Sequence, residues 1–159
     1  MSRLFIMPRH LHTISRHASI SYPEECCGVL IGRHQSGATF VERILSVGNA
    51  RGGDRESRYL ISPETVLAAH KEARALGLDV VGYYHSHPDH PAVPSAADRE
   101  EAWAGKSYLI VGVEKRRVVA TRSWRFDEES EVFTEEVIDQ AAIGGVPQTG
   151  FAGVHKEAV

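Results

Sequence analysis

Residues 78–98 read LDVVGYYHSHPDHPAVPSAAD, and this stretch decides the fold class and the place of the chemistry. Its first part, 78–84, is apolar and rich in β-branched and aromatic residues, which predicts a buried strand. Its second part carries two histidines two residues apart, a loop broken by three prolines, and a serine three residues before an aspartate. The stretch therefore predicts a strand that delivers polar side chains at its carboxyl end, followed by a loop and a helix over 95–103.

The elements on either side of this stretch alternate between helix and strand. Apolar residues at helical spacing predict a helix over 10–20, and Ser62 before Pro63 marks the start of a second helix that ends at Gly77. Further strands are predicted over 27–32, 39–47, 58–61, 108–113, 118–126 and 131–138. This interspersion predicts an α/β (or α+β) fold, with a mixed β-sheet flanked by helices.

Length and composition predict one domain over 1–140 and a flexible tail, rich in Gly and Ala, over 141–159. The 18 Lys and Arg against 21 Asp and Glu leave no basic excess for nucleic acid. No apolar run reaches the ~20 residues that span a bilayer, and the N-terminus does not resemble a signal peptide. The two cysteines are adjacent and cannot staple a loop, so the chain is expected to be cytoplasmic. The oligomeric state stays open, a homodimer included.

The histidines of the stretch form a candidate metal site. Side chains alternate along an extended chain, so His85 and His87 point to the same side. Two imidazoles at this spacing suit zinc, and a carboxylate can complete the set and leave a fourth position for water. Asp98 is the nearest candidate, because the prolines can fold the loop back towards the strand.

Two plainer interpretations compete with the metal site. Ser95 and Asp98 have the spacing of a capping box, in which both residues only begin a helix. A His-x-His pair alone also occurs often among surface polar residues. The joint arrangement at the end of a buried strand favours a ligand site, since ligands of α/β sheets gather beyond the carboxyl ends of strands.

The pattern His-x-His, seven residues, Ser, two residues, Asp resembles the motif of the JAMM (MPN+) zinc metalloprotease family. His85, His87, Ser95 and Asp98 match it position for position, and PEECCGVLIG supplies the upstream glutamate that the family places before a strand, here Glu25. The resemblance extends over about residues 4 to 138. It implies a JAMM/MPN-like fold with a layering similar to that of the cytidine deaminases. The sequence around the motif is most similar to that of small stand-alone bacterial members.

The resemblance also implies a chemistry. One Zn²⁺ would be held by His85, His87 and Asp98, Glu25 would act as general base, and Ser95 would stabilise the oxyanion. The substrate would be a ubiquitin-fold sulfur-carrier protein with a C-terminal Gly-Gly, from which cysteine or a short extension is released. A broader deubiquitinase-like isopeptidase and a non-catalytic scaffold of the same fold are the alternatives.

Several other residues are candidates for such a site or for the core. Arg51, Arg55 and Arg58 form a loop cluster that either clamps a substrate carboxylate or is only solvated. Cys27 is expected to be a small buried residue, Trp103 and Trp124 are expected in the core, and Gly144-Gly145 in the tail resembles a substrate end.

Overall fold

The computed structural model describes residues 2–140, and it confirms a mixed α/β fold. The strands are β1 (Arg3–Phe5), β2 (Cys27–Gln35), β3 (Ala38–Val47), β4 (Asp79–Pro88), β5 (Ser107–Glu114), β6 (Arg117–Asp127) and β7 (Val132–Asp139). The helices are α1 (Pro8–Ser21), α2 (Pro63–Ala75) and α3 (Ala96–Glu100). None of the helices in this part of the chain is long and apolar enough to cross a membrane. The predicted tail with Gly144-Gly145 lies outside the described residues.

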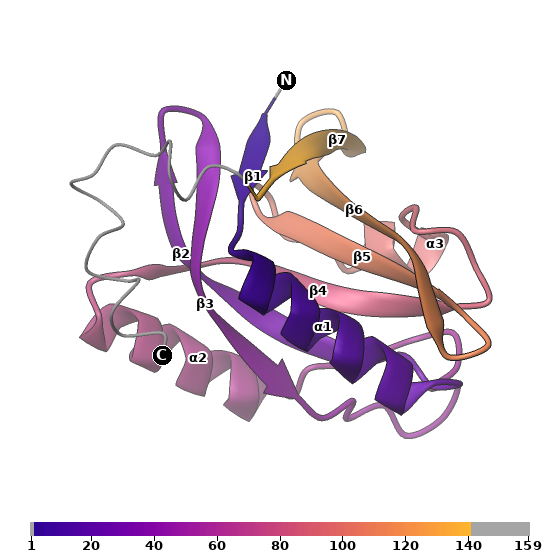
Figure 1. Cartoon of the computed structure of the whole chain (residues 1–159). Helices are drawn as coiled ribbons and strands as arrows, with labels where there is room; N and C mark the ends of the chain where they lie inside the picture. Colours follow the sequence, from indigo (N-terminus) through magenta and orange to yellow (C-terminus); the bar gives the residue numbers. More distant parts are fainter. Residues whose placement is uncertain (1, 141–159) are drawn as a thin grey trace.

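The strands form one sheet that closes on itself in the order β1-β3-β2-β4-β5-β6-β7. The short strand β1 closes it, because it pairs in parallel with both β3 and β7 (Figure 1). β4 and β5 are also parallel, and the remaining neighbours are antiparallel. Closure leaves few unpaired strand edges. The sequence did not predict β1 or the closure, since three residues carry no measurable periodicity.

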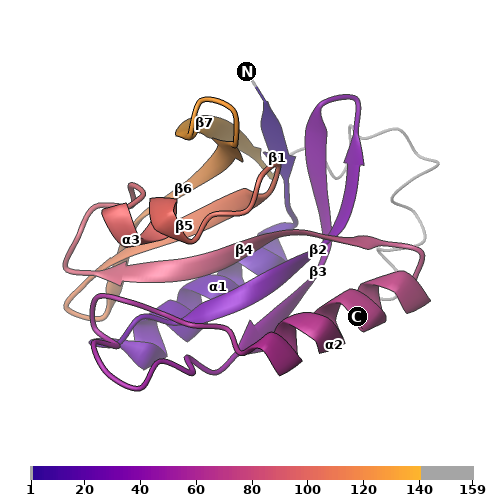
Figure 2. The same ribbon diagram turned by 180° about the vertical axis from the view of Figure 1, so that it is seen from behind.

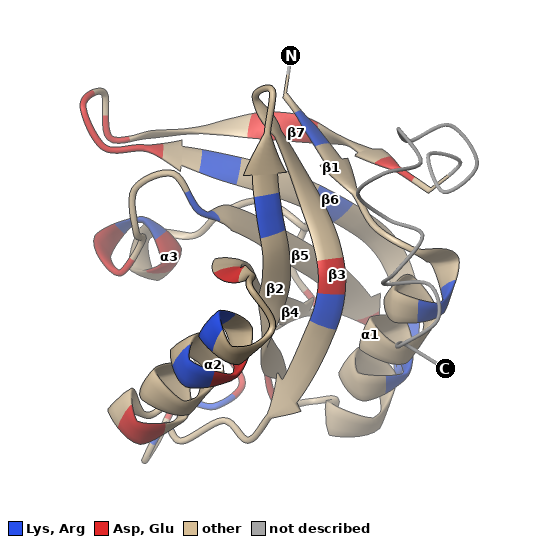
Figure 3. Cartoon of the chain, turned by 90° about the vertical axis from the view of Figure 1, so that its left-hand side faces the viewer, with Lys and Arg blue, Asp and Glu red and all other residues tan. Residues whose placement is uncertain are grey.

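The two long helices cover opposite faces of the sheet, as Figures 2 and 3 show from two further directions. α1 buries Ile14 and Ala18 against a cluster that includes Tyr84, and α2 buries Ala69 against a second cluster that includes Tyr83. Neighbouring residues of β4 thus face different helices. Because side chains alternate along a strand, the histidines after Tyr84 lie on the α2 side.

Two predicted elements differ from the structure. Residues 58–61 form no strand, because their backbone groups bond to the side chain of Asn49 and to Ala50 instead of to a neighbouring strand. The helix predicted over 95–103 ends at Glu100. It stops early because the chain turns back towards β5 through Gly105, whose φ is +73°, and the Trp103 amide donates to the Tyr108 hydroxyl.

Candidate metal centre

The end of β4 has a neighbouring strand on one side only. Its pairing with β2 stops at Cys27 opposite His85, while its pairing with β5 continues to Pro88. The sequence predicted that the strand ends at residue 84, before the two histidines. In the structure both histidines lie within β4, near its carboxyl end. The Cys26 amide donates to the Ser86 hydroxyl over 2.8 Å, which ties the segment before β2 to the same place.

Three side chains converge on the α2 side of this strand end. Nε2 of His85 lies 3.1 Å from Nε2 of His87, and each of these atoms lies 3.1 Å from one carboxylate oxygen of Asp98. All three residues are buried. Because only an unprotonated Nε2 can bind a metal, this triangle can hold a cation in place of protons.

The spacing of the three donor atoms fits a small tetrahedral cation. Bonds of about 2.0–2.1 Å in a tetrahedral set place neighbouring donors roughly 3.3–3.4 Å apart, close to the 3.1 Å seen here. Two imidazoles and one carboxylate are also the donor set of hydrolytic zinc sites. The structure thus brings together the three predicted ligands, and their ligand role stays a prediction.

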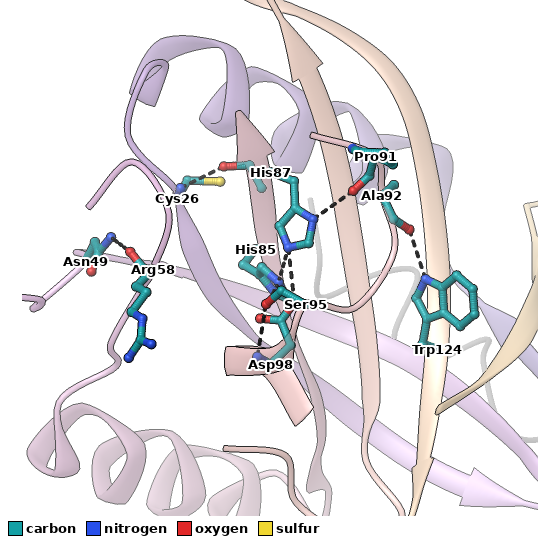
Figure 4. A network of polar contacts seen from close by, with 11 residues as sticks. Cys26, Asn49, Arg58, His85, His87, Pro91, Ala92, Ser95, Asp98 and Trp124 are labelled. Carbon is teal, nitrogen blue, oxygen red and sulfur yellow. Dashed lines mark hydrogen bonds and ion pairs between the residues drawn. The ribbon is translucent and has the colours of Figure 1, made fainter. Parts of the chain in front are cut away.

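His87 is held in the tautomer that a metal ligand needs. Its Nδ1 lies 2.8 Å from the carbonyl oxygen of Pro91, which can only accept, so Nδ1 carries a proton and Nε2 is the nitrogen that is left for a metal (Figure 4). The next carbonyl, of Ala92, accepts from the indole N–H of Trp124 at 3.0 Å. The loop between β4 and α3 is therefore anchored by two side chains at adjacent carbonyls.

Ser95 and Asp98 form the capping box that the sequence offered as the plainer alternative. The Ser95 hydroxyl accepts from the Asp98 amide, and Oδ2 of Asp98 accepts from the Ser95 amide. The same Oδ2 faces His87, so one carboxylate serves the cap and the cluster. Ser95 is exposed. Its hydroxyl oxygen accepts the cap bond, so its hydroxyl proton can be donated to another group.

Charges within the cluster reinforce the arrangement. Burial opposes ionisation of Asp98, but the two facing histidines hold the pKa of its carboxyl well below the usual range. Burial lowers the pKa of His85, which favours the neutral ring that a metal requires.

Glu25 lies in the irregular segment before β2, close enough to His87 and Asp98 for their charges to act on it. Burial raises the pKa of Glu25 to about 8, and His87 offsets part of that rise. Its Oε1 is buried and has no hydrogen-bond partner among residues 2–140. A carboxyl with a near-neutral pKa can both accept and return a proton.

Tyr59 is a site residue that sequence reasoning missed. Its ring stacks on the imidazole of His85, with centroids 4.5 Å apart and planes at 23°. No sequence signal marks a single tyrosine in a loop, because the stacking arises only when the loop folds against β4.

The predictions for the remaining candidate residues were partly right and partly wrong. Cys27 is fully buried and burial raises its pKa to about 12, which agrees with its expected packing role. Trp103 is 64% exposed, so its assignment to the core was wrong; it lies on the turn that ends α3. Trp124 is partly buried against the second core cluster, as predicted. The carbonyl of Arg55 accepts from the Glu25 amide, and the guanidinium of Arg55 donates to the carbonyl of Arg51 in the same loop, so a carboxylate clamp by these arginines stays a prediction.

Comparison with known families identifies the domain. The profile described as prokaryotic homologs of the JAB domain matches residues 7–127. The chain belongs to this family. The JAMM/MPN resemblance seen in the sequence is thereby confirmed, and the histidine, serine and aspartate positions of the motif all fall within the matched residues.

Relatives and solved structures give the same picture. A desampylase from Haloferax volcanii is 39% identical over 69% of this chain and 76% of its own length. A probable TtuB-protein conjugate cleaving protease from Thermus thermophilus is 34% identical over 68% of this chain and 70% of its own. The solution structure of a Desulfitobacterium hafniense protein, 30% identical, superposes with a TM-score of 0.72 over 87% of this chain and 92% of its own. A JAB1/MPN domain protein from Archaeoglobus fulgidus, 17% identical over 87% of this chain and 97% of its own, shares the fold at a TM-score of 0.51.

Proposed function

We propose that this protein is a zinc-dependent metallopeptidase that hydrolyses the bond after the C-terminal glycine of a ubiquitin-like protein. The observation that carries the proposal is the buried triangle of His85, His87 and Asp98, with the buried carboxyl of Glu25 beside it. Two relatives named for the cleavage of conjugates support the reaction class. We further propose that the substrate is a sulfur-carrier protein that bears cysteine or a short extension after its C-terminal glycine.

A zinc ion held by His85, His87 and Asp98 would polarise the scissile carbonyl and lower the pKa of a water molecule towards ~7. Glu25 accepts the proton of that water and passes it to the departing amine. Its burial suits both roles, because the raised pKa puts proton uptake and release near neutral pH.

Ser95 donates a hydrogen bond from its hydroxyl to the carbonyl oxygen as negative charge develops there. The cap bond orients this group, since the serine oxygen already accepts from the Asp98 amide and the proton is left to point elsewhere. Asp98 and the Pro91 carbonyl hold His87 in one orientation. The residues thus form a preorganised site on a rigid strand end and a short helix.

A groove beside the centre suits the body of a ubiquitin-like substrate. It has a volume of about 770 Å³ and runs between α2 and the segment after α3. Its lining includes Tyr59, which stacks on His85, so the groove borders the centre across this ring. Leu67 and Trp103 contribute exposed apolar surface, with acidic Glu100 and Glu101 at the same wall. We propose that an apolar patch flanked by basic residues on the carrier docks here.

A charge placed in this groove tests the docking. Leu67 is 57% exposed, so Leu67→Asp leaves the core intact and puts a carboxylate into the apolar surface. We expect KM for a folded carrier substrate to rise about tenfold, equivalent to ~1.4 kcal/mol, with kcat nearly unchanged. Ile20→Asp is the matched control, because Ile20 is 68% exposed on α1, on the opposite face of the sheet. An equal rise in KM for both variants would contradict the docking site.

A substrate panel tests the function as a whole. The zinc-loaded protein is mixed with one ubiquitin-fold carrier whose Gly-Gly end is joined either to the α-amine of free cysteine or to a lysine side chain of a second protein. Faster release of cysteine supports the sulfur-carrier proposal, and faster cleavage of the lysine conjugate supports the broader isopeptidase. Cleavage of neither, with zinc bound, overturns the peptidase proposal in favour of a scaffold.

A further inference from the structure

Asn49 uses all of its side-chain hydrogen-bonding capacity on one loop and on Glu25. Its Nδ2 donates to the carbonyl oxygen of Glu25 and to that of Arg58, both at 3.1 Å, and Figure 4 draws the bond to Arg58. Its Oδ1 accepts from the amides of Arg51 at 3.0 Å and Leu60 at 3.1 Å. Only a primary amide offers two donors and two acceptors in this way, and a flipped amide would set its NH₂ against two N–H donors.

The loop that Asn49 closes also holds the other backbone group of Glu25. The Glu25 amide donates to the carbonyl of Arg55 over 2.6 Å. Pairing of β2 with either neighbour begins only at Cys27, so Glu25 has no strand to hold it. Both backbone groups of Glu25 therefore rest on the segment 49–60, and Asn49 is the side chain that keeps this segment closed.

The same closure fixes the wall of the metal centre. Tyr59, which stacks on His85, lies between the two loop residues that Asn49 bonds, Arg58 and Leu60. The amide of Ala50 adds a bond to the carbonyl of Leu60 at 2.8 Å. One side chain thus links the carboxyl beside the centre to the ring that packs on a predicted ligand.

We propose that Asn49 is a positioning residue that fixes the carboxylate of Glu25 relative to the metal centre. This inference rests on the proposed function, in which Glu25 moves the proton. Asn49 itself touches neither substrate nor metal. It acts by holding the backbone of Glu25 and the loop that carries Tyr59, so its loss should affect turnover much more than substrate binding.

Asn49→Asp is the sharpest variant. A carboxylate keeps both acceptors for the loop amides and loses both donors, so it removes the bond to Glu25 while leaving half of the loop closure. We expect kcat of the zinc-loaded protein to fall about 10- to 100-fold, the usual cost of losing an outer support of a metal site, with KM changed less than about twofold. Ser57→Ala is the control, because the Ser57 hydroxyl donates within the same loop, to the carbonyl of Asp54; it should retain full activity.

A double mutant separates positioning from a general loss of structure. In a Glu25→Gln background, Asn49→Asp should lower kcat less than about twofold further, since residues that act as a unit are not additive. A full second loss would contradict the inference. If Asn49→Asp does not fold, Asn49→Ser is measured in the same cycle, because its hydroxyl can still reach one partner.

A readout without turnover keeps this inference distinct from the proposed function. Hydrogen exchange of the Glu25 amide, followed in the zinc-loaded full chain, should be about tenfold faster in Asn49→Asp than in the wild type or Ser57→Ala. Unchanged exchange would overturn the positioning role even if the protein is an active peptidase. Faster exchange in Asn49→Asp, together with a zinc-loaded wild type that cleaves no carrier, would overturn the proposed function alone.

Discussion

Replacing Glu25 by glutamine should abolish most turnover while zinc stays bound. Glutamine keeps the size of the side chain and cannot accept the proton of the attacking water, so we expect kcat to fall about 10²- to 10⁴-fold. Glu25 is 5% exposed, and an uncharged amide at this buried position should not destabilise the fold. Steady-state kinetics on the carrier adduct, with metal content measured on the same sample, check the prediction.

The neighbouring residue supplies the control. Glu24 is exposed and precedes Glu25 directly, so Glu24→Gln makes the same chemical change one position away. Its kcat and zinc content should equal those of the wild type. Equal losses in the two variants, or full turnover in Glu25→Gln, would show that proton transfer does not depend on Glu25.

Asp98→Asn should remove the metal itself. The amide is the size of the carboxylate, but it carries no negative charge and presents an NH₂ group to one of the histidines that now face Asp98 at 3.1 Å. Mutation of a residue that only supports a metal ligand usually lowers metal affinity about 10- to 100-fold. Loss of a ligand itself should therefore lower zinc affinity by more than about 100-fold. Dialysed wild type should retain about one zinc per chain, and Asp98→Asn almost none.

Thermal unfolding gives a second measure of the same change. A ligand that binds only the folded state adds about 2.7 kcal/mol at 100 times its Kd, which is roughly 5 °C or more for a domain of this size. Zinc should raise the Tm of the wild type and leave that of Asp98→Asn unchanged. Asp127→Asn is the control, because Asp127 also accepts from a serine amide three residues away, that of Ser130, but lies at the end of β6. Retention of zinc by Asp98→Asn would remove Asp98 from the ligand set.

The sequence was most informative where the spacing of residues has a direct structural meaning. The alternation of a strand put His85 and His87 on one side, and the proline-broken loop returned Asp98 to them, as the 3.1 Å separations show. The two interpretations of Ser95 and Asp98 proved compatible, because one carboxylate oxygen bonds both the helix start and His87.

The sequence was least informative where a side chain replaces regular secondary structure. Residues 58–61 have the composition of a strand, yet their backbone groups bond to the side chain of Asn49. The same side chain also bonds the carbonyl of Glu25, so this segment supports Glu25. The stacking of Tyr59 follows from how that loop lies against β4, and the exposure of Trp103 follows from the turn that leads from α3 back to β5. Such contacts join residues far apart in the chain and leave no periodic trace.

Hydrolysis in ¹⁸O-labelled water tests the central claim most directly. The zinc-loaded protein is mixed with a ubiquitin-fold carrier that bears a C-terminal cysteine, and the carrier product is weighed by mass spectrometry. We expect free cysteine and a carrier that ends in glycine with one solvent oxygen in its new carboxylate. No release by the zinc-loaded protein, or equal release after the metal is removed by a chelator, would contradict it.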